Sequence, residues 1–290
     1  MGKSREIKKR MKAVANIRRI TKTMQMIATA KFSAAQQRAT SSKPYAQSIF
    51  ELVAQLSSAA GEVQHPLMLA PGSSAKPLLL VITSDRGLCG PYNGSILRKM
   101  MAFVREDAMV RSGEIELVGK KGAGFLKFNK IEVSRTHVIG DKPRYEDVER
   151  LAQEYIDRYS RGEIGPVRVV SMRFISAGKQ TPEITQLLPF SAPAKGDAGD
   201  KHGATPLYEF SPSAGELIGA LLPAAIKSVL FQLFNEAVVS EHVARMIAMK
   251  AATDNAGKMG KNLSRQFNRA RQAQITTELT EIISGAAALG

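Results

Sequence analysis

The last fifty or so residues constrain most strongly how this chain can fold. Residues 240–290 contain no proline and few bulky aliphatic side chains, and Ala, Gly, Met and Thr stand where a core helix would carry Leu. A proline-free run of this length predicts a long helix, and its small side chains allow another helix to approach its backbone closely. By length and composition only the N-terminal stretch can supply that helix, so residues 4–39 are the predicted partner. The two ends of the chain are therefore expected to pair.

The N-terminal stretch has the composition of a long helix. Residues 1–43 contain no proline, and Gly2 is their only glycine, so a helix of up to about 60 Å is possible at about 1.5 Å per residue. Two rows of apolar residues have coiled-coil spacing: Ile7, Met11 and Val14, then Ile17, Ile20, Met24 and Ile27. The extra interval of three between the rows predicts a stammer, which overwinds a coil locally. An amphipathic helix on a globular core fits the same spacing.

Positive charge is concentrated at the N-terminus. The chain carries a net charge of +15 with a pI near 10.0, and its first 38 residues hold eleven cations against the single anion Glu6. Such an excess predicts an acidic partner, which can be nucleic acid, anionic lipid or an acidic protein surface. The absence of Trp and an aromatic content of 6% weaken the case for a base-stacking platform.

Composition also excludes several kinds of site. The single cysteine, Cys89, excludes an internal disulfide framework and a multi-cysteine metal site, and the four histidines have no ligand spacing, so no metal is expected. Lys and Arg recur where a secretory signal would need an apolar core. Residues 217–234 form the most apolar stretch, but Pro223, Lys227 and Gln232 interrupt it, and it is a poor candidate membrane span.

The middle of the chain alternates between strand and helix patterns. Predicted strands lie at 78–82, 115–118, 131–139, 167–176 and 184–188, and predicted helices at 93–110, 123–128 and 145–159. This alternation predicts a small Rossmann-like α/β domain, with helices on both faces of a mostly parallel sheet.

The segments that flank this domain contain turn and cap signals. Pro44 either interrupts the N-terminal helix or begins another that covers residues 45–60, and residues 61–77 and 189–206 have loop composition. A short strand is predicted at 207–210. Ser213 and Glu216 then have the spacing of a capping box that begins the C-terminal helix, and Gly285 is its predicted end.

The nucleotide-binding and catalytic motifs expected of an α/β enzyme do not match. The glycines between Gly119 and Gly124 follow GxxGxG, not GxGxxG, and residues 113–120 have the wrong spacing for a P-loop. Cys89 follows a strand, as a nucleophile might, but no His lies near it in sequence, and a small buried hydrophobe is the commoner role. No catalytic residue or cofactor site is predicted.

Three separated stretches resemble the gamma subunit of rotary F-type ATP synthases. The first is residues 20–28 with Lys31, the second is the SDRGLCG sequence from Ser84 to Gly90 with Asn93, and the third is residues 240–256 with 268–282. They occur in the order that the family has, and the resemblance covers essentially the whole chain.

The resemblance implies an antiparallel, left-handed coiled coil of the terminal helices together with an α/β domain. The implied divisions are an N-terminal helix at 1–60, an α/β foot at 75–190, a loop and short strand at 191–212 and a C-terminal helix at 213–290. In this family the chain is a non-catalytic shaft, present once per complex, that turns within an alpha–beta ring whose beta subunits carry the ATP chemistry. Its foot, together with the epsilon subunit, rests on the c-ring in the membrane. The delta subunit belongs to the same complex. The resemblance implies no cofactor. The chain lacks a transit peptide and the chloroplast insertion, which indicates a bacterial form on the cytoplasmic face of the inner membrane.

The resemblance also implies roles for individual residues. Met24 and Arg245 match positions that contact the beta-subunit lever, and the basic residues of the first helix, with Lys250, would face its acidic loop. Four further residues match the upper catch region: Arg271, Gln272, Thr276 and Glu281. Tyr208 and Glu209 match the foot that faces the c-ring, and the tail 285–290 could run in an apolar sleeve or simply fray. Each of these residues could instead be coil packing or solvated surface.

Two other classes of function remain to be tested. A basic coiled-coil nucleic-acid-binding protein would bind DNA of any sequence with steep salt dependence. An α/β enzyme built on Asp85, Arg86 and Cys89 would be active as the isolated chain.

Overall fold

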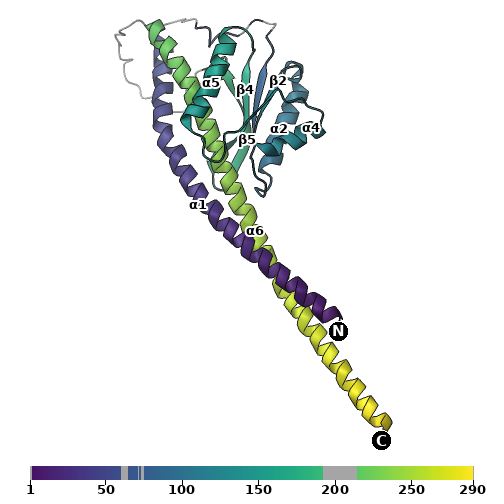
Figure 1. Ribbon diagram of the computed structural model, residues 1–290. Coiled ribbons are helices and arrows are strands. Elements are labelled where there is room, and N and C mark those ends of the chain that lie inside the picture. Colours follow the sequence, from purple (N-terminus) through teal and green to yellow (C-terminus); the bar gives the residue numbers. More distant parts are fainter. Residues whose placement is uncertain (1, 60–64, 71, 73–74, 192–213, 290) are drawn as a thin grey trace. The chain divides into compact units, whose positions relative to one another are not determined.

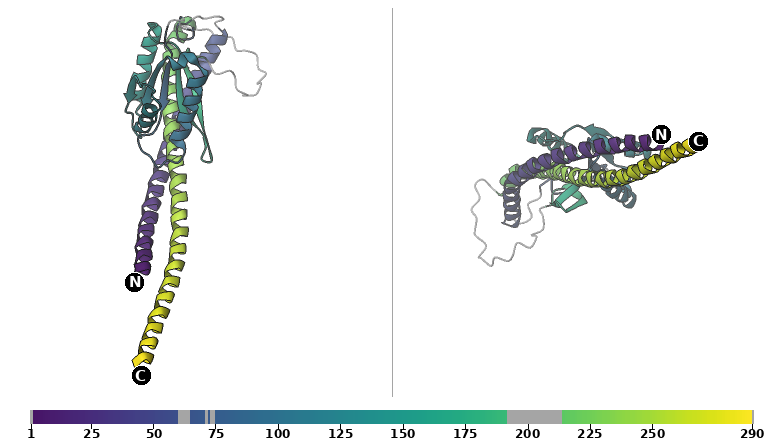
Figure 2. Two further views of the ribbon diagram at one scale, coloured as in Figure 1. Left: turned by 90° about the vertical axis from the view of Figure 1, so that its right-hand side faces the viewer. Right: turned by 90° about the horizontal axis from the view of Figure 1, so that it is seen from below.

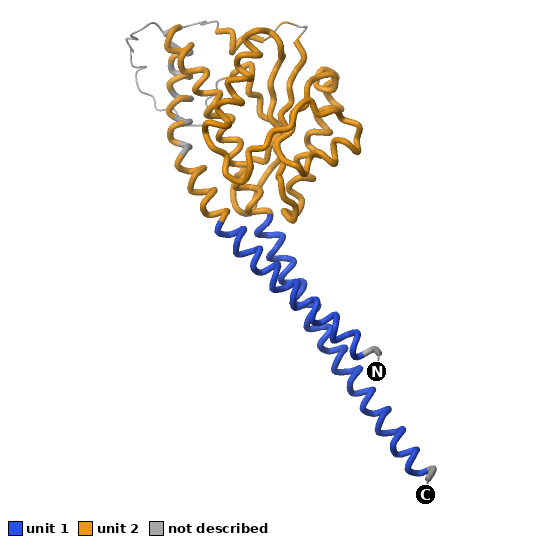
Figure 3. Tube along the Cα trace, viewed as in Figure 1, with its two compact units in different colours: residues 1–30, 245–290 blue, residues 31–244 orange. Residues whose placement is uncertain are grey.

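The computed structural model describes residues 2–59, 65–70, 72, 75–191 and 214–289. These residues form two compact units, one of residues 1–30 with 245–290 and one of residues 31–244 (Figure 3). Two long helices contribute to both units, α1 (Gly2–Ala59) and α6 (Ala214–Leu289) (Figure 1). The predicted divisions at 60, 75, 190 and 213 remain predictions.

Unit 1 is an antiparallel pair formed by the N-terminal part of α1 and the C-terminal part of α6 (Figure 2). Thr253 Oγ1 donates a hydrogen bond to Thr21 Oγ1 at 2.8 Å, and Ser4 Oγ donates to Gln274 Oε1 at 3.1 Å. The two helices therefore run in opposite directions. The predicted pairing of the two ends of the chain is confirmed.

The contact between the helices follows one heptad register. On α6 one row of buried and half-buried positions, with Ala252, Gly257 and Ser264 half-buried beside it, is spaced alternately four and three: Met249, Thr253, Ala256, Gly260, Leu263, Phe267, Ala270 and Gln274. On α1 the corresponding positions are Ile7, Met11, Val14, Thr21, Gln25 and Ala28. We call these two rows the seam. Most of its central members are small, which allows the backbones to lie close together.

The predicted second row of the seam and the stammer are wrong. Ile17, Ile20 and Ile27 are 51%, 56% and 53% exposed, and Met24 is only half-buried. Val14, Thr21 and Ala28 are buried instead and continue the first row at intervals of seven. Near the small residues Thr253 and Ala256 of α6, the seam of α1 therefore contains Thr21, and Ile17, Ile20 and Ile27 lie outside it.

Both predicted helix breaks are also wrong. Pro44 lies inside α1, although a proline removes one backbone hydrogen bond, and Ile49, Val53 and Leu56 anchor the turns that follow it in the core of unit 2. Gly285 lies inside α6, which ends at Leu289. A helical glycine costs only about 1 kcal/mol relative to Ala, and three alanines follow it.

Unit 2 contains the predicted α/β sheet, with strand order β3-β2-β1-β4-β5. Its strands are β1 (Leu78–Ile82), β2 (Glu114–Val118), β3 (Arg135–His137), β4 (Val167–Ser176) and β5 (Lys179–Leu188). β1 to β4 are parallel, and β5 pairs antiparallel with β4. The shorter helices are α2 (Tyr92–Glu106), α3 (Ala108–Arg111), α4 (Lys120–Phe128) and α5 (Tyr145–Ser160). The fold class is as predicted.

Several predicted elements of unit 2 differ in extent, and the helix expected at 123–128 and the strand expected at 184–188 begin earlier, at Lys120 and Lys179. The helix expected at 93–110 is divided at Asp107, whose carboxylate accepts hydrogen bonds from the amides of Met109 and Val110 and so caps α3. The strand expected at 131–139 is reduced to three residues, because it lies at the edge of the sheet and only Arg135–His137 pair with β2. The predicted short strand at 207–210 and the capping residue Ser213 lie outside the described residues.

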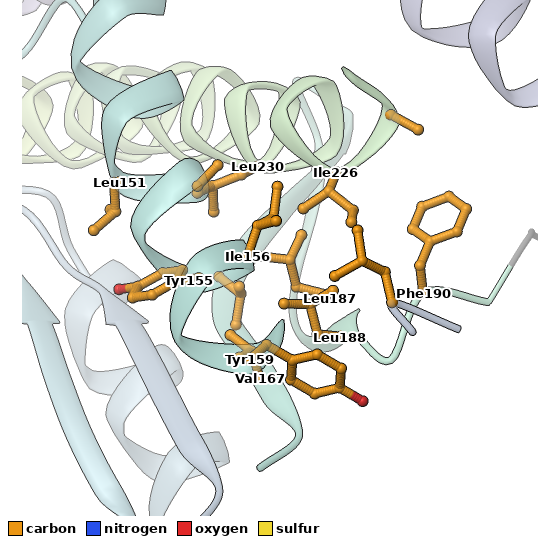
Figure 4. Close-up of a cluster of buried hydrophobic side chains, with 14 of the residues drawn as sticks. Leu151, Tyr155, Ile156, Tyr159, Val167, Leu187, Leu188, Phe190, Ile226 and Leu230 are labelled. Carbon is orange, nitrogen blue, oxygen red and sulfur yellow. The ribbon is translucent and has the colours of Figure 1, made fainter. Parts of the chain in front are cut away.

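The two faces of the sheet are covered by different helices. Leu78, Leu80 and Ile82 of β1 pack in one core with α5, α6 and residues 49–56 of α1, and Figure 4 shows side chains of α5, β4, β5 and α6 that meet there. Leu79 and Val81 pack in a second core with α2 and α4. By length and composition, α6 contains one stretch that is apolar enough to span a membrane. All of residues 217–234 except Ala220 are buried or half-buried in unit 2.

The assignment of the seam predicts opposite outcomes for two sets of substitutions. Replacing Ile17, Ile20 and Ile27 together with Gln should leave the Tm of the isolated chain within a few degrees of wild type, because these side chains are about half exposed. Val14→Gln, a single change in the seam, should destabilise the chain by about 1–3 kcal/mol because it buries a polar group. Thermal unfolding followed by circular dichroism measures both. A triple variant less stable than Val14→Gln would contradict the assignment.

Candidate functional site

The carboxyl ends of the parallel strands are where an α/β domain of this kind would bind a ligand. Strand order reverses between β1 and β4, and such folds bind ligands in the crevice outside that point. Here α6 fills the position: Phe234, Ala237 and Glu241 line a residual cavity of about 20 Å³, together with residues that follow β1. Tyr92 Oη donates a hydrogen bond to the Ala237 carbonyl at 3.1 Å. That space is too small for a nucleotide.

The glycine-rich segment before α4 is also occupied by the chain itself. The backbone amides of Lys120, Lys121 and Gly122 donate to Asp85 Oδ1, the Ser84 carbonyl and Thr83 Oγ1 at 3.2, 3.0 and 3.2 Å. The N-terminal amides that could hold a phosphate therefore already have acceptors.

The glycines of this segment serve packing. Gly119 has φ +86°, and a Cβ there would lie 2.3 Å from the Thr83 carbonyl oxygen. At Gly122 a Cβ would lie 2.6 Å from Leu117 Cδ1. Glycine is thus required for α4 to lie against the end of β1.

The loop that contains Cys89 is held by an internal hydrogen-bond network. Asn93 Nδ2 donates to Ser84 Oγ at 2.8 Å and to Cys89 Sγ at 3.3 Å, and the Ser84 amide donates to Asn93 Oδ1 at 3.0 Å. Cys89 is 2% exposed, and Leu88 and Gly90 have positive φ values of 63° and 57°. This arrangement gives the SDRGLCG sequence and Asn93 a structural role.

The residues of the enzyme hypothesis do not converge on a reaction centre. Asp85 caps α4, Cys89 is buried, and Arg86 lies 3.9 Å from Asp141. Their side chains thus contribute to three separate structural contacts.

A buried polar cluster, which sequence spacing did not predict, lies between β2, β3 and α5. Glu116 Oε2 is 2.6 Å from His137 Nε2 and accepts a 2.6 Å hydrogen bond from Tyr155 Oη, and Arg158 lies 3.6 Å from Glu116 Oε1. Burial by itself raises the pKa of Glu116, but the hydrogen bonds from His137 and Tyr155 outweigh it, so the pKa is lowered. Burial and the Glu116 charge raise the pKa of Tyr155 well above its usual value. The cluster therefore holds one carboxylate ionised within a core, with both of its oxygens engaged.

The predicted contact residues lie in different environments. Arg271, Gln272, Thr276 and Glu281 are exposed on α6, where the Thr276 hydroxyl bonds back to the Gln272 carbonyl at 3.0 Å. Met24 is half-buried and Arg245 is buried. Tyr208 and Glu209 lie outside the described residues.

Two rows of exposed apolar side chains were not predicted as surface. We call Ile17, Ile20 and Ile27 the α1 stripe, and the α6 stripe consists of Ile275, Leu279, Ile282 and Ile283, which are 48–70% exposed. The α6 stripe follows Gln274, the last residue of the seam on that helix. Rows of exposed apolar side chains are candidate interaction surfaces. The apolar spacing on α1 was assigned to the seam, and the structure places these residues on the surface instead.

Comparisons with known proteins agree with one another. A family model described as ATP synthase matches residues 3–289. The chain is 41% identical over 296 residues to the ATP synthase gamma chain of Rhodopirellula baltica, covering 100% of this chain and 99% of that one, and 39% identical over 292 residues to that of Leptospira biflexa, with 100% of both covered.

Solved structures resemble the chain in fold. The rotor of the Euglena gracilis mitochondrial ATP synthase in rotational state 1 aligns with a TM-score of 0.64 and 18% identity, covering 94% of this chain and 99% of that one. The central stalk and c-ring structure from Tetrahymena thermophila gives 0.57 and 20%, covering 80% and 99%.

The Glu116 cluster predicts a pH-dependent contribution to stability. Because the folded-state pKa of Glu116 is lowered, its contribution is present above the unfolded value of about 4.5 and is lost as the pH falls through the folded value. Glu116→Gln should cost about 1–3 kcal/mol at pH 7, and this difference should shrink below about pH 4.5, where protonated Glu resembles Gln. Urea unfolding at both pH values measures this, with Glu106→Gln, at an exposed position of α2, as the control. An equal cost at both pH values would contradict the prediction.

Proposed function

We infer that this chain, which belongs to the ATP synthase gamma chain family, is the central rotor shaft of an F-type ATP synthase. It transmits torque between the ion-driven membrane c-ring and the catalytic alpha–beta ring, so that ion translocation is coupled to ATP synthesis or hydrolysis. The observation that carries this inference is the slim antiparallel helix pair of unit 1, whose seam has small residues at its centre while Ile17, Ile20 and Ile27 remain exposed.

The structure of the α/β domain accounts for the lack of catalysis by this chain. The gamma chain is a non-catalytic subunit, and ATP is turned over on the beta subunits. The ligand-binding position of the α/β domain is filled by α6, and the α4 amides are already bonded. An enzyme-like topology without an open site is consistent with a mechanical role.

The family assignment does not support the nucleic-acid-binding alternative. The basic residues of α1 instead suit acidic protein surfaces that slide past the shaft. Exposed ion pairs contribute at most about 1 kcal/mol each, and such weak contacts allow a shaft to turn.

The proposed partners are alpha, beta, epsilon and delta subunits and a c-ring, with one copy of this chain in each complex. Such a subunit is peripheral to the membrane, and we place it at the cytoplasmic face of a bacterial inner membrane because its closely similar relatives come from bacteria. Contact with the membrane is indirect, through the c-ring.

Individual contacts are proposed on the same basis. Met24 and Arg245 would meet the beta-subunit lever, and the exposed α6 residues Arg271, Gln272, Thr276 and Glu281 would meet the catch region. The α6 stripe and the uncharged tail that follows it would provide an apolar surface for the top of the ring. Tyr208 and Glu209 are proposed as the contact with the c-ring.

The function is tested by reconstitution. Purified chain mixed with alpha, beta and epsilon subunits should assemble into an ATPase, whereas the isolated chain should not hydrolyse ATP. Hydrolysis by the isolated chain would overturn the proposed function.

The lever contact predicts that Met24→Lys disturbs coupling. An added cation at a contact with an acidic loop should strengthen that contact at one rotational angle of the shaft and hinder release of the loop. Fewer protons should then be pumped for each ATP hydrolysed, while hydrolysis continues. Inverted membrane vesicles that contain the complex allow both rates to be measured. The matched control is Met109→Lys, since Met109 is exposed on α3, and an unchanged ratio in Met24→Lys would count against the contact.

A further inference from the structure

Two consecutive residues of α1 are held by different parts of unit 2. Lys31 Nζ donates to Asp141 Oδ2 at 2.6 Å, and Asp141 lies in the loop between β3 and α5. The Phe32 ring lies 6.1 Å, centroid to centroid, from the ring of Phe174 in β4. Because β2 and β1 separate β3 from β4 in the sheet, these contacts come from well-separated strands. Consecutive helical side chains point about 100° apart, so α1 is held from two directions.

β4 and the loop between β3 and α5 also interact with α6. The Phe174 amide donates to Glu236 Oε2 at 3.4 Å, and Phe32 and Phe174 pack on a small cluster of Ala35 with Val238 and Val239. Burial alone would raise the pKa of Asp141, but Lys31 and, to a lesser degree, Arg86 and His242 lower it. His242 belongs to α6, so the Asp141 carboxylate interacts with both helices. We call Lys31, Phe32, Asp141, Phe174 and Glu236 the collar.

The collar lies at a defined place along the chain. Lys31 is the first residue of unit 2, and Ala244, eight residues after Glu236, is its last. The chain crosses between the units twice, in α1 between residues 30 and 31 and in α6 between residues 244 and 245. Ala28 and Ala35, the buried apolar residues of α1 on either side of Lys31 and Phe32, are small. Small side chains present a smooth surface that resists rotation of a helix about its own axis only weakly.

We propose that the collar fixes the rotational position of α1 and α6 on the α/β domain, so that the two helices turn with the domain. This proposal rests on the inferred shaft function. A partly exposed ion pair adds little to stability. Asp141 is therefore a positioning residue whose main effect is on coupling, and Phe174 positions α1 through its ring contact with Phe32.

The test uses the whole complex in inverted membrane vesicles. Asp141→Asn keeps the shape of the side chain and removes its charge, and Phe174→Ala removes the ring contact. The protons pumped per ATP hydrolysed should fall at least twofold in the double variant and less in each single variant, while the Tm of the isolated Asp141→Asn chain changes little. Asp141→Glu, which keeps the charge, should retain the wild-type ratio. The matched control is Asp147→Asn, which removes an ion pair with Arg144 beside α5 and should not change the ratio.

The outcomes separate the collar from the shaft function. A wild-type ratio in the double variant would overturn the collar while leaving the shaft function intact. A ratio that falls equally in Asp141→Asn and Asp141→Glu, in step with the Tm, would also overturn it, because the residue would then be merely structural. If Asp141→Asn fails to assemble, Lys31→Met removes the same ion pair from the other side, and unchanged coupling in that variant would overturn the collar. A wild-type chain that assembles but pumps no protons would contradict the shaft function and the collar together.

Discussion

Close packing of α1 against α6 through small side chains is the constraint on which unit 1 depends. Thr21 bonds to Thr253 inside the seam, and Ala256 and Gly260 leave space for Val14 and its neighbours. Ile17, Ile20 and Ile27 lie outside the seam and form the α1 stripe, and the α6 stripe lies beyond Gln274, where the seam ends. The helix pair is therefore slim at its centre and carries exposed apolar side chains on α1 and on the end of α6.

In unit 2 the same helix, α6, completes the core and closes the ligand-binding position. Ile226 and Leu230 pack beside α5 and β5 (Figure 4), and further along α6 Phe234 and Ala237 occupy the crevice at the strand ends. Tyr92, which in an open α/β domain could face a ligand, bonds to the α6 backbone. The domain therefore combines a Rossmann-like strand order with a ligand position that its own helix fills, and fold and function are separable here.

The sequence was informative where a pattern depends on near neighbours along the chain. The apolar run at Leu78–Ile82 and the alternation of strand and helix patterns after it predicted the sheet. The proline-free ends of the chain predicted the long helices. Periodicity found the isoleucine row but could not say which row faces α6, since that depends on the size of the residues opposite. Pro44 stays helical because tertiary packing outweighs a local preference. Glu116 and His137 are 21 residues apart, and only strand pairing brings them together. The contact residues, Met24 to Glu281, came from family resemblance and remain proposals.

The central claim, that this chain is a rotating shaft, is tested most directly by watching it turn. An alpha–beta ring assembled with this chain would be fixed to a surface, with a bead attached through a cysteine that replaces the exposed Lys179 at the β4–β5 turn. The account predicts that the bead rotates continuously in one direction when ATP is added and stops when ATP is exhausted. A bead that stays still while the same complexes hydrolyse ATP would contradict it.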